Sequence, residues 1–152
     1  MKDILLMDEP VKLKGLWMFE TFDAKGELVE SFTKENLITT VGKGLSLDRL
    51  FGLSSAIAIA GMAVGTSATA AAVGDTAITA AVYKAFDSTP TRSSLTVTGF
   101  TTFSTSEANI NIQEVGLLTA SGGVLFNRLA PVGPFNKTSA VSLKITVQIT
   151  QA

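Results

Sequence analysis

The sequence predicts a mainly β protein: a jelly-roll-like two-sheet β-sandwich of about eight strands, with an N-terminal β-hairpin and one helix. Residues 141–150 alternate apolar and polar side chains, which is typical of a strand with one buried face. From residue 95 onward, short apolar runs are separated by turn residues. The chain has 152 residues, the size of one ordinary domain. We therefore expect an arm at residues 1–14 and a single sandwich domain over 15–152.

The arm and the hairpin occupy the N-terminal part. Residues 1–14 mix charged and apolar residues around Pro10, so we expect an extended segment that either reaches a neighbouring subunit or frays. The aromatic-rich run 14–22 and the run 28–32 flank the turn sequence 23–27, which predicts a hairpin.

One helix is expected over about residues 37–51. Asn36 is a favourable N-cap residue, and Leu37, Val41 and Leu45 follow at helical spacing. Gly52 predicts the end of the helix.

The stretch 57–79 lies at the centre of the predicted organisation. Residues 57–64 alternate large and small side chains, which predicts a buried strand. Residues 65–78 are rich in glycine, alanine and threonine and predict a long loop, closed by Gly74-Asp75-Thr76, that lies against a neighbouring subunit. The uncharged run 50–74 is long enough to span a membrane but has too few large aliphatic residues to insert well.

The rest of the chain predicts further strands. We expect a strand at 82–86 and a connector at 88–93. A change in apolar parity at Gln113-Glu114 predicts a β-bulge. Residues 120–123, Ala-Ser-Gly-Gly, predict a tight hairpin turn before another strand.

The composition argues against catalysis, metal binding, and binding to nucleic acid or membranes. The chain has no cysteine and no histidine, so it lacks the commonest general base and the thiolate ligands of zinc. The net charge of -1 gives no field that would attract nucleic acid or anionic lipid. A calcium site at Gly74-Asp75-Thr76 would have a single carboxylate. We expect no enzymatic activity, cofactor, metal, nucleic acid or membrane partner.

Glu114 and Arg128 are the two charges that the 120–123 turn brings together. Counting outward from the turn places them opposite each other or one step apart, where a carboxylate and a guanidinium can form a bidentate pair. One interpretation is an acid held in a binding cleft. The favoured interpretation is a structural ion pair that fixes the hairpin register.

Six short motifs are spread over roughly residues 35–150. They are Glu35-Asn36-Leu37-Ile38-Thr39, Val64-Gly65-Thr66, Gly74-Asp75-Thr76-Ala77-Ile78, Val82-Tyr83-Lys84, Ile112-Gln113-Glu114-Val115-Gly116-Leu117 and Leu125-Phe126-Asn127-Arg128. In these motifs the chain resembles the small virion structural proteins of tailed bacteriophages. This resemblance implies a β-sandwich that assembles on the particle, as a capsid cement (decoration) protein or as a tail component.

The first hypothesis is a homotrimeric cement protein of the virion, assembled in the bacterial cytoplasm, that clamps the major capsid protein through its arm and loops. The alternatives are a tail fibre, adaptor or baseplate component and, from another class, a carbohydrate-binding module. Trp17 and Phe19 form either an exposed aromatic face or part of the core. The candidate contact residues are Ile4, Leu5, Leu6, Trp17, Phe19, Gly65, Thr66, Ala70, Ala71, Ala72, Gly74 and Asp75.

Overall fold

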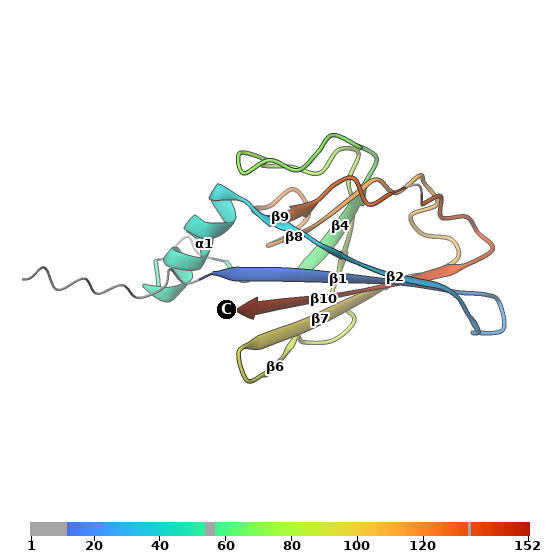
Figure 1. Ribbon diagram of the computed structural model, residues 1–152, viewed down its shortest axis with the longest axis horizontal. Helices are drawn as coiled ribbons and strands as arrows, with labels where there is room; N and C mark the ends of the chain where they lie inside the picture. The colour runs from blue at the N-terminus through green and yellow to red at the C-terminus, as the bar shows by residue number, and fades with distance from the viewer. Residues whose placement is uncertain (1–11, 54–56, 134) are drawn as a thin grey trace, which may run out of the picture.

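The computed structural model describes residues 12–53, 57–133 and 135–152. Within these ranges the chain forms ten strands and one helix, arranged as two five-stranded sheets (Figure 1). The predicted all-β two-sheet sandwich is confirmed. The candidate contacts Ile4, Leu5 and Leu6 lie outside the described residues. Leu13 and Lys14, which the sequence assigned to the arm, are the first residues of strand β1.

Each sheet is antiparallel throughout. The chain changes sheets four times, so that neighbouring strands often come from distant parts of the sequence. Sheet A contains, in spatial order, β2 (Leu28–Glu35), β1 (Leu13–Phe22), β10 (Ser142–Gln151), β7 (Thr96–Phe103) and β6 (Thr91–Ser93). Sheet B contains β3 (Leu37–Ile38), β9 (Leu125–Leu129), β8 (Glu114–Leu118), β4 (Gly61–Gly65) and β5 (Val82–Ala85).

The core lies between the sheets, and sheet A supplies it with alternate residues of β1 and β10. Trp17 stands opposite Val147 and Phe19 opposite Ile145 in the register. All four side chains are buried. The interpretation of Trp17 and Phe19 as surface contacts is therefore wrong. Burying such large apolar groups contributes about 1.5–3 kcal/mol each, which favours the core position.

The three central strands of sheet B are buried on both faces. Larger side chains of β4 and β8, including Met62 and Val115, face the core. The opposite face has small residues, and Ile78 from the β4–β5 connection packs there beside Ala63. A side chain at Gly65 would collide with Ile78 and with the Thr79 backbone. Gly65 is therefore buried and is not the exposed contact residue that the sequence suggested.

The helix begins later than predicted. α1 spans Thr40–Leu50, and its N-cap is Thr39, whose Oγ1 accepts a hydrogen bond from the Gly42 N–H at 2.9 Å. Asn36 is not the N-cap, because Leu37 and Ile38 pair with β9 and keep the chain extended. The predicted stop at Gly52 is confirmed by its φ of 63°.

Three strand predictions are corrected. Residues 57–60 are not in a strand, because the partners of β4 extend only to Gly61. Residues 91–93, expected within a connector, form β6 through pairing with β7. The register shift on β8 lies between Leu117 and Leu118, and β8 itself begins at Glu114. The change of parity at Gln113-Glu114 instead marks the start of that strand.

Figure 1 shows how these elements divide the molecule into two ends. Helix α1 lies at one end of the sandwich, close to where β1 begins and β10 finishes. The β1–β2 turn lies at the opposite end.

Candidate functional site

The candidate site is the long connection between β4 and β5, residues 66–81, which we call the central loop. It lies on the outer face of sheet B, where small residues leave room for it. Of the predicted contact residues in this loop, Thr66, Ala70, Ala72 and Gly74 are exposed. Ala71 and Asp75 are half-buried.

Glu114 ties both ends of the central loop to the sheet. It is the first residue of β8, and its side chain is fully buried. Its Oε1 accepts hydrogen bonds from the Ser67 N–H at 3.1 Å and from the Thr79 N–H at 2.7 Å. A buried carboxylate thus satisfies two backbone donors that an irregular loop would otherwise leave unpaired.

Arg128 makes the remaining connections. Gly116 stands opposite Arg128 in the register, which puts Glu114 one diagonal place away on the same face. Arg128 Nε donates to Glu114 Oε2 at 2.8 Å, so the predicted ion pair is present. The pair is not bidentate, because Nη1 donates to Asp75 Oδ2 at 2.8 Å and Nη2 donates to the Thr69 carbonyl at 3.0 Å.

Glu114, Arg128 and Asp75 form one unit, which we call the Arg128 cluster. The guanidinium fork serves three acceptors at once, which a lysine ammonium could not do in the same plane. Asp75 Oδ2 also accepts the Ala72 N–H at 2.8 Å. The cluster therefore fixes the loop at Ser67, Thr69, Ala72 and Thr79, along most of its length.

Protonation equilibria agree with this geometry. The Ala72 N–H, and then Arg128, lower the pKa of Asp75 below its usual value although partial burial opposes them. Burial lowers the pKa of Arg128, but hydrogen bonds to Glu114 and Asp75 outweigh it and raise the pKa above the ordinary value. Arg128 and Asp75 are thus charged at neutral pH, and the carboxylate of Asp75 is balanced by a neighbouring cation.

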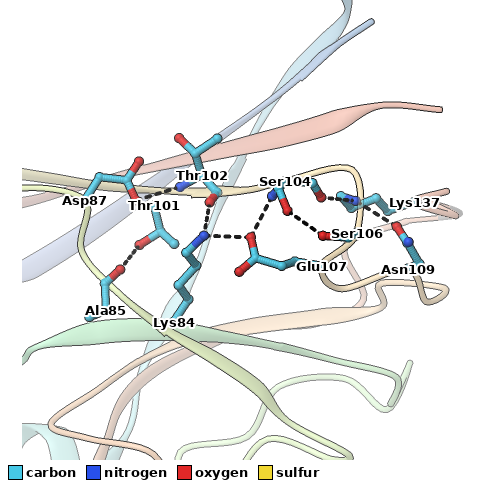
Figure 2. A network of polar contacts seen from close by, with 10 residues as sticks. All are labelled: Lys84, Ala85, Asp87, Thr101, Thr102, Ser104, Ser106, Glu107, Asn109 and Lys137. Atoms are coloured by element: carbon cyan, nitrogen blue, oxygen red, sulfur yellow. Dashed lines mark hydrogen bonds and ion pairs between the residues drawn. The ribbon is translucent and has the colours of Figure 1, made fainter. Parts of the chain in front are cut away.

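A second polar site closes one edge of the sandwich, where β5 of sheet B meets β7 of sheet A (Figure 2). Lys84 Nζ donates to the Thr102 carbonyl and to Glu107 Oε2, both at 2.7 Å. Glu107 Oε2 also accepts the Ser104 N–H at 2.8 Å. Hydrogen bonding to Lys84, then to Ser104, lowers the pKa of Glu107 to about 2.

Lys137 extends this site into the interior. Its side chain is buried, and Nζ donates to the Ser104 carbonyl and to Asn109 Oδ1, both at 2.8 Å (Figure 2). Burial lowers the pKa of Lys137, while the charge of Glu107 opposes that shift. We call Lys84, Glu107, Lys137 and Asn109 the Lys137 network, which holds residues 104–109 in place.

Sequence reasoning missed Asp75 as a partner of Arg128 and the structural role of Lys137. The available signal was the scarcity of charge: the described residues from 57 to 152 include nine charged side chains. Each makes an identified contact. Beyond the two clusters, Asp87 accepts the Thr102 N–H, Arg92 donates to the Ser94 carbonyl, and Lys144 lies over the Phe100 ring. In a charge-poor segment, each charge was a candidate for a structural role.

The described part of the chain contains no group of three or more histidine, cysteine, aspartate or glutamate side chains placed to hold a metal ion. Its helix is too short to cross a membrane.

Comparison with known proteins yields no match to a family model, to a curated protein or to a solved structure.

Proposed function

We propose that the protein is a structural component of a phage virion, and specifically a capsid cement protein that contacts the shell through its central loop. The observation that carries this proposal is a long exposed loop of small residues held in one conformation by a buried ionic cluster. Long loops with fixed structure in compact domains are commonly functional.

The Arg128 cluster prepares the central loop for binding. A flexible loop must lose conformational freedom when it binds a partner, and that loss weakens the interaction. Four backbone positions of this loop are already fixed by Glu114, Arg128 and Asp75. Its short exposed side chains allow a partner backbone to approach closely, with little side-chain entropy to lose.

The distribution of charge supports a protein contact as well. Asp75 is the one charged residue of the central loop, and Arg128 pairs with it from beneath. The exposed alanine and threonine positions therefore form a surface that is inexpensive to desolvate, as the central part of an interface requires.

The test is incorporation into particles. Ala70→Lys and Ala72→Lys place a charge at two exposed side-chain positions. The cluster bonds the backbone N–H of Ala72, which the substitution keeps, and neither methyl group, so the fold should keep its stability within about 0.5 kcal/mol. We expect each variant to be absent from purified particles although the isolated protein keeps its β spectrum. Ala24→Lys, in the exposed β1–β2 turn, is the matched control and should be incorporated.

Quantitative mass spectrometry of the same particles distinguishes positions on the virion. Hundreds of copies per particle support a cement protein, whereas a few dozen or fewer indicate a tail component and overturn the cement assignment. Normal incorporation of both loop variants would exclude the central loop as the contact surface.

A further inference from the structure

A second surface feature lies at the α1 end of the molecule. The start of β1, the β3 strand and helix α1 enclose a groove of about 540 Å³, which we call the β1–α1 groove. Its apolar lining comes from Leu13, Leu37, Ile38 and Leu47. Leu47 is 59% exposed, so much of its apolar surface is accessible to a partner.

The groove also carries a concentration of positive charge. Lys12, Lys14 and Lys43 line it, and all three are exposed. None of the three ammonium groups pairs with a carboxylate of the described residues. Asn36 lines the same groove, and its carboxamide has no hydrogen-bond partner there. The surface thus combines apolar contacts, unpaired cations and an amide.

Such a surface suits a peptide segment in which carboxylates flank a short apolar run. Residues 1–11 of this chain, MKDILLMDEPV, have that composition. The apolar residues from Ile4 to Met7 lie between Asp3 on one side and Asp8 and Glu9 on the other. Fully extended, a segment of eleven residues spans about 36 Å, which is enough to reach an adjacent copy of this chain.

Residues 1–11 join the described part of the chain at the groove itself. Lys12, which lines the groove, is held by paired backbone hydrogen bonds with Ala152. When the grooves of two copies face each other, the segment of each copy therefore starts beside the groove of the other.

We propose that the β1–α1 groove of one copy binds residues 1–11 of a second copy, so that copies of the chain are joined by exchanged N-terminal segments. Lys12, Lys14 and Lys43 receive the acidic residues, and the leucines receive the apolar run. This inference goes beyond the proposed function, because it concerns how copies hold one another in solution and not what they attach to on a particle.

The absence of cysteine from the chain makes a direct test possible. Two single-cysteine variants, Leu5→Cys and Leu47→Cys, are mixed under mild oxidation, so that a mixed disulfide can form only between molecules. We expect this heterodimer to exceed the one obtained when Leu5→Cys is mixed with Ala24→Cys, a control at the opposite end of the sandwich. Equal yields with both partners would overturn the proposal.

Two further measurements separate charge recognition and binding within one molecule. Lys43→Glu should reduce the yield of the disulfide heterodimer several-fold, whereas Lys25→Glu in the β1–β2 turn should not. If the double variant Leu5→Cys/Leu47→Cys instead closes a disulfide within a single monomer, the exchange is excluded. A chain beginning at Lys12 should be monomeric by light scattering. A wild-type chain that is also monomeric at high concentration contradicts the proposal.

Discussion

The Arg128 cluster and the Lys137 network hold two loops by opposite arrangements of charge. In the first, one buried cation is shared between two carboxylates, and its side chain is 5% exposed. In the second, the buried cation Lys137 is bonded to a carbonyl and an amide oxygen. The carboxylate of that network, Glu107, is 39% exposed and pairs with Lys84, which is 33% exposed.

This difference determines what each site contributes to stability. Removing one member of a buried ion pair leaves an uncompensated charge in the interior, which is strongly unfavourable. Removing a member of a partly exposed pair leaves a charge that water can solvate, so the loss is small. The two sites should therefore respond very differently to matched substitutions.

The largest effect is expected at Glu114. Glu114→Ala leaves Arg128 short of a partner and leaves the Ser67 and Thr79 N–H groups without an acceptor. We expect the free energy of unfolding to fall by about 3–5 kcal/mol, measured by urea denaturation. Arg128→Ala should lower the free energy of unfolding by a similar amount, because it leaves the buried carboxylate of Glu114 without its cation.

The double variant sharpens this prediction. With both charges removed, Glu114→Ala/Arg128→Ala should lose less stability than the sum of the two single variants, since no buried charge remains unpaired. Single variants that unfold at the same urea concentration as the wild type would contradict a structural role for the ion pair.

A smaller effect is expected at Lys137. Lys137→Met keeps the length of the side chain but leaves two buried acceptors, the Ser104 carbonyl and Asn109 Oδ1, without this donor. The loss should be about 1–3 kcal/mol, the cost of unsatisfied polar groups, and part of it is offset because a buried charge disappears. Calorimetry can measure it against Lys25→Met, an exposed control expected to be neutral. A Lys137→Met variant as stable as this control would show that the network does not need its cation.

The sequence could predict contacts that can be counted from a turn. Glu114 and Arg128 belong to one hairpin, so the turn at residues 120–123 sets their relative position. Asp75 is 53 residues from Arg128 and reaches it because the central loop lies on the outer face of sheet B. No local pattern in the sequence predicts the contact between Asp75 and Arg128.

The same limit explains which elements were predicted well. β10 has one buried face, so its apolar and polar residues alternate, and this alternation predicts the strand from the sequence. β4, β8 and β9 are covered on both faces, so their sequences do not alternate between apolar and polar residues, and their ends cannot be located from that periodicity. The start of α1 was misplaced because Asn36 and Thr39 are both good N-cap residues, and pairing of β3 with β9 decides between them.

The smallest effect should come from Glu107, and it should depend on pH. The pKa of Glu107 is about 2 in the folded protein and about 4.5 when unperturbed, so its ion pair stabilises the fold above pH 4.5 and this contribution is lost as the pH falls toward 2. Because the carboxylate is more than a third exposed, solvent screening should keep the contribution below about 1 kcal/mol. Glu107→Gln should thus be less stable than the wild type at about pH 6, and the difference should vanish near pH 2. Urea denaturation at both pH values measures this difference. If the difference in the free energy of unfolding between the two proteins stays constant with pH, Glu107 acts through its shape and hydrogen bonds, and its charge contributes nothing.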